Sequence, residues 1–422
     1  MEARRPVVDF DHHSKEYAHR VFTDPTGFFQ QMQREHPVAW SEKYGGFWII
    51  SRYDDVKRIS EDDALFSSRN DLPHSGAAFS GITIPGNHAR STPIEMDPPE
   101  FFDYRRLLNR WFAPAAVEKL KPKMLEFTTW CIDRHIESGA IDLVMDLASP
   151  VPAMMTLYVL GIALEHWPLY ADTAHAVVYT PPDSPEKRKA IEGDMMMRNT
   201  FVEVIKERRR KPGADIISHL ISARIDGRPI PDPVLIEICS LIVHGGVDTT
   251  TSLLANTFEY LERTPAGRQR LIDNPDLIFS AGEEFLRYYC PVQMLGRTAT
   301  RDVEVGGQLI RAGERVGLWW AAANHDPAMF EHPERIILDR FPNRHAAFGL
   351  GIHRCLGSNF ARAQYAVVLE EVLKRMPGYR LIREQAEHYE SIGTVNGYVK
   401  MPATFTPARR IAAPLEITAL NQ

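Results

Sequence analysis

The stretch Phe348-Gly349-Leu350-Gly351-Ile352-His353-Arg354-Cys355-Leu356-Gly357 decides the fold, and an apolar helical pattern follows it directly, from Phe360 onward. A cysteine just before a helix lies at the positive end of the helix dipole, which favours the thiolate over the thiol. The glycines allow backbone angles that other residues avoid, so the loop can approach a large flat group closely. A thiolate, a tight loop and basic neighbours together suit a sulfur ligand to haem iron.

Taken alone, Cys355 could equally be a small buried hydrophobe beside a glycine-rich turn. The full pattern F-G-x-G-x-H-x-C-x-G, from Phe348 to Gly357, resembles the haem-ligand loop of the cytochrome P-450 family at every fixed position. The resemblance implies haem b (iron protoporphyrin IX) as cofactor and Cys355 as the axial ligand of its iron. It also implies that His353 lies near a haem propionate and that Phe348 packs beside the sulfur.

The composition is that of an ordinary globular chain. The 422 residues carry a formal net charge of −6, so bulk basicity does not point to nucleic acid. Hydrophobic residues (44%) are spread evenly without a low-complexity linker, which predicts one domain over residues 1–422. The four cysteines lie far apart, as expected in a reducing cytoplasm. Residues 1–13 are charged and have no apolar run, so we expect no signal peptide or membrane anchor and a cytoplasmic location.

A long, mostly apolar helix is predicted from Pro233 to about Arg263, with His244-Gly245-Gly246-Val247-Asp248-Thr249-Thr250 in its middle. Each glycine costs a helix about 1 kcal/mol against alanine, and such breaches of local propensity are expected at functional sites. Thr249 can donate to the carbonyl of Gly245 and loosen the helix. The missing side chains at Gly245 and Gly246 would leave a groove for dioxygen and a water molecule.

An acid next to an alcohol suits proton delivery. Splitting dioxygen needs two protons, and Asp248 could supply them from outside through the hydroxyl of Thr249. The alternative is a kinked core helix with a buried, paired aspartate. The segment matches the P-450 signature [AG]-G-x-[DE]-T, and this resemblance implies a monooxygenase that uses dioxygen instead of peroxide.

The resemblance also places the residues that hold the haem propionates. Asp97-Pro98-Pro99-Glu100 predicts the start of a helix, and Arg105 on that helix matches the position that binds one propionate in the family. Arg297 matches the position that binds the other, and its forked donors suit a carboxylate. Phe101 stands where many members have histidine, so one propionate contact is expected to be missing or replaced.

Local patterns add the scaffold. Two strands are predicted at 38–40 and 47–50, and Asp54 is expected to cap the short helix that follows. The E-x-x-R pattern of residues 284–287, completed by Arg340, resembles the structural ion pair of the family and is assigned to the scaffold.

The substrate pocket is less clearly marked. The long loop from Leu72 to Ile94 is typical of a lid. Methionine runs such as 195–197 are more often core filler than ligand contacts, and His244 could face a polar substrate group or be a core histidine bonded to backbone. The candidates for the pocket lining are Phe79, Ile82, Ile84, Met196, His244, Gly245, Val292, Met294 and Val395.

Fold and function follow from the resemblance, which runs from about Trp40 to Thr404. It implies a mainly α protein, the triangular helical P-450 fold with small β-sheets. It implies insertion of one oxygen atom of dioxygen into a C–H or C=C bond, while the thiolate pushes electron density onto iron. A hydrophobic terpenoid, steroid or polyketide is the expected substrate. Electrons are expected from a separate ferredoxin with its reductase, docked where Arg354, Arg362 and Lys374 give a positive patch.

Two other functions stay open. One is a haem-thiolate enzyme of another reaction type, such as a peroxygenase or a phenol-coupling enzyme, and the other is a non-catalytic haem-binding sensor. The complete pair of Asp248 and Thr249 argues against both.

Overall fold

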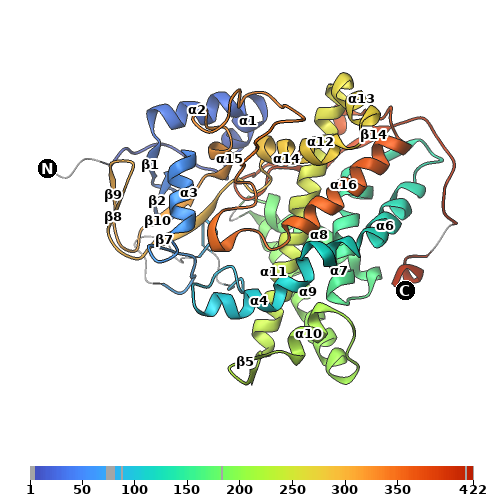
Figure 1. The fold of residues 1–422 in the computed structure, drawn as a ribbon, viewed down its shortest axis with the longest axis horizontal. Helices are drawn as coiled ribbons and strands as arrows, with labels where there is room; N and C mark the ends of the chain where they lie inside the picture. Colours follow the sequence, from blue (N-terminus) through green and yellow to red (C-terminus); the bar gives the residue numbers. More distant parts are fainter. Residues whose placement is uncertain (1–4, 73–80, 87–88, 182–183, 414–415, 422) are drawn as a thin grey trace.

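The computed structural model describes residues 5–72, 81–86, 89–181, 184–413 and 416–421, and most of them form helices. Figure 1 shows the sheet region beside helices α1 to α3 on one side and the larger helical part on the other. The mainly α class predicted from the sequence is therefore confirmed. The helices are α1 (Lys15–Thr23), α2 (Pro25–Glu35), α3 (Tyr53–Glu61), α4 (Glu100–Phe112), α5 (Pro114–Glu118), α6 (Lys121–Asp133), α7 (Pro150–Leu160), α8 (Trp167–Tyr179), α9 (Pro185–Arg210), α10 (Ile216–Ser222), α11 (Asp232–Gly246), α12 (Asp248–Arg263), α13 (Pro265–Asp273), α14 (Leu277–Tyr289), α15 (Trp320–Ala323) and α16 (Ser358–Arg375).

The largest sheet has the strand order β1-β2-β10-β7-β3. The predicted strands at 38–40 and 47–50 are confirmed as the antiparallel pair β1 and β2. The sheet contains β1 (Val38–Ser41), β2 (Phe47–Ile50), β3 (Phe66–Ser67), β7 (Leu295–Ala299) and β10 (Arg315–Leu318). A three-stranded sheet contains β4 (Ala140–Asp142), β11 (Arg380–Leu381) and β14 (Pro402–Thr404), and three hairpins pair β5 (Arg224–Ile225) with β6 (Arg228–Pro229), β8 (Val303–Val305) with β9 (Gln308–Ile310), and β12 (Glu387–His388) with β13 (Tyr398–Lys400).

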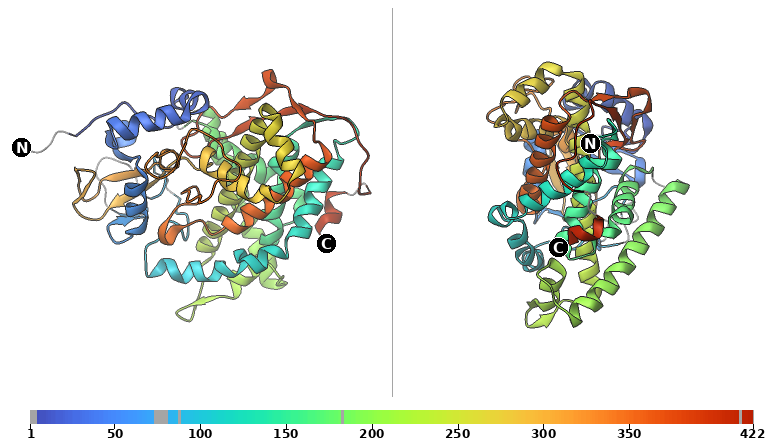
Figure 2. Two further views of the ribbon diagram at one scale, coloured as in Figure 1. Left: turned by 45° about the horizontal axis from the view of Figure 1, so that its top comes forward. Right: turned by 90° about the vertical axis from the view of Figure 1, so that its right-hand side faces the viewer.

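The long central helix is broken where the sequence departs from helix propensity. The prediction of one helix over 233–263 was wrong in this respect, because α11 ends at Gly246 and α12 begins at Asp248. Val247 between them has φ −93° and ψ −72°, at the edge of the right-handed helical region, and its N–H still donates to the carbonyl of Val243 at 3.2 Å. α12 packs against α8, α14 and α16, so the helix that follows the cysteine loop lies against the second half of the broken helix. Figure 2 shows α9 along one outer edge of the molecule.

The helix α3 is capped from a distant part of the chain. Asp54 was predicted to cap it, but the helix begins one residue earlier, at Tyr53, and Asp54 lies in the first turn. The backbone N–H of Tyr53 donates to the carboxylate of Asp326 at 2.9 Å. A tertiary contact therefore satisfies a helix-end donor that the sequence assigned to a local residue.

The predicted scaffold ion pair is confirmed. Arg287 donates to both carboxylate oxygens of Glu284, at 2.9 and 2.8 Å, and Arg340 donates to Glu284 at 2.9 Å. The side chains of Glu284 and Arg287 have no exposed area. Arg287 also donates to the carbonyls of Asn324 and Pro333. A buried pair satisfied in this way fixes α14 to the segment that leads to the cysteine loop.

Two helical stretches of the described chain have the length and hydropathy of membrane-crossing helices, 143–160 and 232–263. The first is 83% buried within the protein, and the second contains the broken central helix, so both also have the character of core helices.

Candidate functional site

The cysteine loop is closed by its own backbone. The N–H of Cys355 donates to the carbonyl of Phe348 at 2.7 Å. Gly349 and Gly351 have φ of 68° and 69°, which glycine adopts without strain. A Cβ on Gly351 would lie 2.1 Å from the carbonyl oxygen of Ser60 on α3, so the loop can approach α3 only with glycine at this position.

The surroundings of Cys355 do not by themselves favour a thiolate, contrary to the argument from the helix dipole. Cys355 is the one exposed cysteine of the four. Burial raises the pKa of the Cys355 thiol, against the opposite effects of the Gly357 backbone and of Arg105, Arg354 and Arg362. The helix α16 begins only at Ser358, three residues further on. A bound metal cation deprotonates a coordinating thiol outright, so an iron bound here would supply the charge that favours the thiolate.

Two buried polar side chains, His353 and Arg297, lie beside the loop. Neither ring nitrogen of His353 has a hydrogen-bond partner among the described residues. Burial, with Arg297 and Arg105 nearby, lowers the pKa of His353 to about 3. The guanidinium of Arg297 donates to the carbonyl of Gly296 at 2.8 Å, and burial lowers its pKa to about 10.

A buried polar side chain without a partner is costly, so His353, which lies near Arg297 and Arg105, calls for a hydrogen-bonding group from outside the chain. Arg105 is a third donor in this group and reaches the carbonyl of Arg354 at 2.7 Å. A large planar group that carries carboxylates fits this arrangement, with an iron that accepts the sulfur of Cys355. The residues therefore fit haem.

Phe101 has a packing role in place of a polar one. It is buried in the first turn of α4, and its ring centroid lies 4.5 Å from that of His353. The guanidinium carbon of Arg105 lies 6.0 Å from the same ring. The phenylalanine thus holds two of the predicted propionate-binding side chains by contact.

The two glycines of the broken helix do different things. The hydroxyl of Thr249 donates to the carbonyl of Gly245 at 2.9 Å, as predicted. A Cβ on Gly245 would meet nothing within 4 Å, so this position borders open space. A Cβ on Gly246 would lie 2.8 Å from Oγ1 of Thr156 on α7. Gly246 therefore permits close packing, and the prediction that both glycines open a groove holds only for Gly245.

Asp248 is buried and bonded to two residues that no motif marked. Its Oδ1 lies 2.7 Å from Nδ1 of His175 on α8 and 2.7 Å from the hydroxyl of Tyr389. All three side chains are almost fully buried. His175 and Tyr389 lie in stretches without a recognisable pattern, so only the tertiary structure could reveal them.

The predicted pocket residues fall into separate groups. Val292 and Val395 form an isolated β-bridge, so these two are brought together. Ile82 and Ile84 are buried, and the carbonyl of Ile82 accepts from Gly296 on β7. The side chain of Met294 is also buried; a Cβ on Gly317 would lie 2.5 Å from its sulfur, so it packs on the sheet. Phe79 lies outside the described residues.

Met196 was placed wrongly. Its side chain is 59% exposed, whereas the next residue, Met197, is completely buried. Successive side chains on a helix point about 100° apart, and the sequence did not fix which methionine of the run faces inward. His244 lies 3.2 Å from the carboxylate of Asp194 on α9, so its neighbour is a charged side chain, not the backbone.

Two buried charged side chains, Arg315 and Glu95, hold the loop before α4. Neither was predicted from the sequence. Arg315 on β10 donates to the carbonyls of Gly81 and Thr83 at 2.7 and 2.9 Å. Glu95 accepts from the backbone N–H groups of Ile82 and Ser91. Both are ordinary strand and loop positions in the sequence, so no local signal distinguishes them.

The basic patch predicted on the cysteine face is smaller than expected. Arg362 donates to both oxygens of Glu283 at 2.6 and 2.7 Å, and its guanidinium carbon lies 4.4 Å from the ring centroid of Phe348. Its charge is therefore matched, which corrects the prediction for this residue. Arg354 is exposed, and Lys374 keeps 70% of its side chain exposed beside Glu371.

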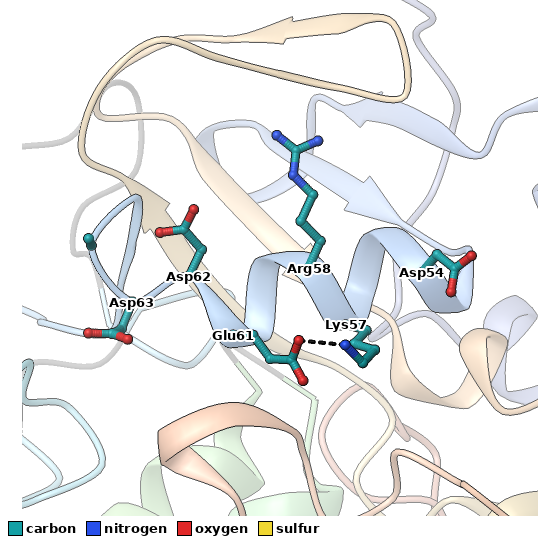
Figure 3. A pocket seen from close by; sticks show the side chains of 7 residues that line it. Asp54, Lys57, Arg58, Glu61, Asp62 and Asp63 are labelled. Atoms are coloured by element: carbon teal, nitrogen blue, oxygen red, sulfur yellow. Dashed lines mark hydrogen bonds and ion pairs between the residues drawn. The ribbon is translucent and has the colours of Figure 1, made fainter.

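A surface hollow of about 470 Å³ lies over α3, away from the predicted site residues. Figure 3 shows its charged lining, in which Lys57 and Glu61 form an ion pair at 2.6 Å. Its mixed charges and open shape give no ligand class. α3 also packs against the turn at 351–353 of the cysteine loop.

Comparison with known proteins agrees with this geometry. The family model of cytochrome P450 matches residues 280–377, which contain the E-x-x-R pair and the cysteine loop. Cytochrome P450 109 of Bacillus spizizenii is 31% identical over 84% of this chain and 84% of its own. Linalool 8-monooxygenase of Pseudomonas putida is 31% identical over 85% of this chain and 90% of its own. The crystal structure of CYP109E1 from Bacillus megaterium in complex with testosterone superposes with a TM-score of 0.82 at 30% identity, over 93% of this chain and all of the other. The chain therefore resembles these proteins in sequence along most of its length, in its fold and in its cysteine loop. It belongs to the cytochrome P450 family of haem-dependent monooxygenases.

Proposed function

We propose that this cytochrome P450 inserts one oxygen atom of dioxygen into a hydrophobic small molecule, with Cys355 as the axial ligand of the haem iron. The observation that carries the proposal is the cluster beside the cysteine. Both ring nitrogens of His353 lack a partner among the described residues, and Arg297 is buried with its charge unmatched by a carboxylate hydrogen bond. Two haem propionates would satisfy these donors, with Arg105 as a third.

The haem, when bound, supplies the redox chemistry that activates dioxygen. The chain supplies the groups around it. Cys355 is the sulfur ligand, Phe348 packs beside it under Arg362, and Gly357 offers a backbone N–H to the sulfur. These contacts hold the orientation of the sulfur.

Asp248 and Thr249 deliver the protons. The hydroxyl of Thr249 lies at the break of the helix, beside the open space at Gly245, and donates to the carbonyl of that glycine. Asp248, one residue earlier, is directed toward α8 and away from that space. A proton can therefore pass from the carboxyl of Asp248, on the α8 side, to the hydroxyl of Thr249, on the Gly245 side.

The substrate is a terpenoid, steroid or polyketide-like molecule. Aliphatic residues (Ile82, Ile84, Val292 and Val395) form much of the predicted lining, and such a lining favours apolar ligands. The relatives agree in class, since one is named for linalool and another was crystallised with testosterone. His244, beside Asp194, could bind one polar group of the substrate.

The electron donor is a ferredoxin with its reductase, docking over the cysteine face. Arg354 and Lys374 remain exposed there and would attract an acidic partner. The enzyme acts in the cytoplasm. It forms one structural domain, a proposal supported by the continuous hydrophobic core that extends from Phe10 to Leu420.

The test combines binding with isotope labelling. Terpenoids and steroids are screened by the shift they cause in the haem absorption band, and ligands that bind are incubated with a ferredoxin, its reductase, NADPH and ¹⁸O-labelled dioxygen. The proposal predicts one labelled oxygen atom in the product. Rapid turnover with hydrogen peroxide and none with dioxygen would instead identify a peroxygenase. Failure to reduce dioxygen with any donor would favour a sensor.

A further inference from the structure

Three buried polar side chains from distant parts of the chain meet at the start of α12. Oδ1 of Asp248 lies 2.7 Å from Nδ1 of His175 and 2.7 Å from the hydroxyl oxygen of Tyr389, and the latter two atoms are 2.9 Å apart. The exposed fractions of His175, Asp248 and Tyr389 are 6%, 0% and 1%. Such a triangle joins α8, α12 and the segment after β12 at one carboxylate oxygen.

The hydrogens in this triangle can be assigned from chemistry. A carboxylate only accepts, so both of its neighbours donate to it. Burial and the charge of Asp248 raise the pKa of Tyr389 well above its ordinary value, which keeps its hydroxyl protonated. His175 must then carry its hydrogen on Nδ1. The other carboxylate oxygen, Oδ2, is buried without a partner among the described residues, and so is Nε2 of His175.

Aromatic packing holds the triangle in place. The ring of Tyr179 stacks on that of Tyr389 at 5.4 Å and lies edge-on to His175 at 5.2 Å. Charged groups of both signs lie around the triangle. Asp172 lies on α8 one turn before His175 and is exposed, and Glu186 and Glu387 act on Tyr179 from α9 and β12. Lys187 on α9 donates to the carbonyl of Val177 on α8. The triangle therefore lies between the helix break and a part of the surface that carries ionisable side chains.

We infer that His175 and Tyr389 are the positioning residues for the proton-donating carboxyl of the reaction. Their two hydrogen bonds orient Asp248 and form the outer end of the path by which protons reach it. This inference rests on the proposed function, in which Asp248 serves Thr249. It assigns a role to two residues that lie outside the signature of the broken helix and outside the cysteine loop.

The inference predicts a specific loss. In His175→Phe, one donor to Asp248 disappears, and the share of consumed NADPH that yields product falls about tenfold, because a hydrogen bond to a charged group is worth roughly that factor or more. Oxygen that is reduced without insertion leaves as hydrogen peroxide. Tyr389→Phe keeps the ring that stacks on Tyr179 and loses only the hydroxyl, so its loss is in the same direction.

The conservative variant separates positioning from mere folding. The side-chain amide of asparagine places an N–H near the position of Nδ1, so His175→Asn is expected to restore most of the coupling that His175→Phe loses. Tyr179→Phe is the matched control, because it removes a hydroxyl from the same aromatic cluster, and no hydrogen bond joins that hydroxyl to Asp248. Substrate affinity and the haem spectrum are expected to be unchanged in all of these variants.

The experiment measures product, peroxide and NADPH in the haem-loaded enzyme, in H2O and in D2O. The expected result is a larger solvent isotope effect on product formation in His175→Phe and Tyr389→Phe, with His175→Asn and Tyr179→Phe close to wild type. If His175→Phe couples as well as wild type, or His175→Asn is as poor as His175→Phe, the inference is wrong.

A second measurement needs no turnover. Nitrogen-15 NMR of histidine-labelled protein in the reduced, carbon-monoxide-bound state is expected to show His175 with hydrogen on Nδ1, and a resonance for Nδ1 without hydrogen would overturn the assignment. Absence of oxygen insertion by wild type would instead contradict the proposed function, and the NMR result would stand apart from it.

Discussion

Thr249 donates its hydroxyl hydrogen to the carbonyl oxygen of Gly245, at 2.9 Å, across the break between α11 and α12. This bond places the hydroxyl beside the one glycine of the pair whose missing side chain borders open space. The sequence predicted the bond from the spacing of four residues, and the prediction is confirmed. Its consequence for catalysis can be tested by variants of Thr249.

Removal of the hydroxyl should uncouple the reaction. In Thr249→Val the side chain keeps its volume and loses the donor, so proton delivery slows by roughly 10²-fold and peroxide replaces product. Thr249→Ser retains the hydroxyl and is expected to remain close to wild type. The measurement is product and peroxide formed per NADPH consumed. Full coupling in Thr249→Val would show that another group relays the proton.

Phe101 should matter for haem retention through packing. Phe101→Ala removes a buried ring that contacts His353, which costs about 3–5 kcal/mol of stability. Transfer of haem to an apo-acceptor protein is expected to be faster in this variant, and urea unfolding is expected at lower concentration. Phe102→Ala is the comparison variant, at a 39% exposed position whose ring lies edge-on to Phe101 at 5.4 Å, and it should change both quantities much less. Equal behaviour of the two variants would argue against the contact.

The methionine run offers a direct comparison of burial. Met197→Ala should destabilise the protein by about 2–5 kcal/mol, because it removes a fully buried side chain from α9. Met196→Ala should have little effect on stability or on substrate affinity, since its side chain is exposed. Unfolding by urea and substrate titration measure the two. A large loss of affinity in Met196→Ala would return this residue to the pocket.

The ion pair between Glu283 and Arg362 should make stability depend on pH. Burial opposes ionisation, but Arg362 and His345 lower the pKa of Glu283 from 4.5 to about 2. A carboxyl with a depressed folded-state pKa contributes stability above its unfolded value, and this contribution is lost as pH falls toward the folded value. Glu283→Gln should therefore cost about 3 kcal/mol near neutral pH, with a difference that shrinks between pH 4.5 and 2.

Unfolding by urea at several pH values measures that difference, with Glu370→Gln at an exposed position of α16 as the control. A constant difference across this pH range would mean that the pair contributes through packing and not through charge.

Much of the fold could be predicted because the deciding features are local. The cysteine loop, the glycine pair with its acid and alcohol, and the pattern at 284–287 each combine residue types that ordinary helices and loops avoid. The strands at 38–41 and 47–50 follow from apolar runs on either side of a glycine turn. In each case neighbours in sequence are also neighbours in space.

The rest depends on contacts that no local pattern records. The partners of Asp248 lie 73 and 141 positions away, and the cap of α3 comes from Asp326. The run of three methionines does not show which of them faces the core, so the exposure of Met196 could not be predicted. Arg362 is not a free surface charge because it forms an ion pair with Glu283, which is distant in sequence. The helix after Cys355 begins only at Ser358, and burial raises the pKa of the thiol against the effect of the nearby arginines, so the helix dipole alone does not account for a thiolate.

The most direct test of the account is the absorption spectrum of the reduced, carbon-monoxide-bound protein, with wild type beside Cys355→Ser. The account predicts a strongly red-shifted Soret band in wild type that is lost in the variant, because only a thiolate ligand donates enough electron density to the iron. An ordinary haem–carbon monoxide band in active wild type, or a red-shifted band that persists in Cys355→Ser, would contradict the assignment of Cys355 as the ligand.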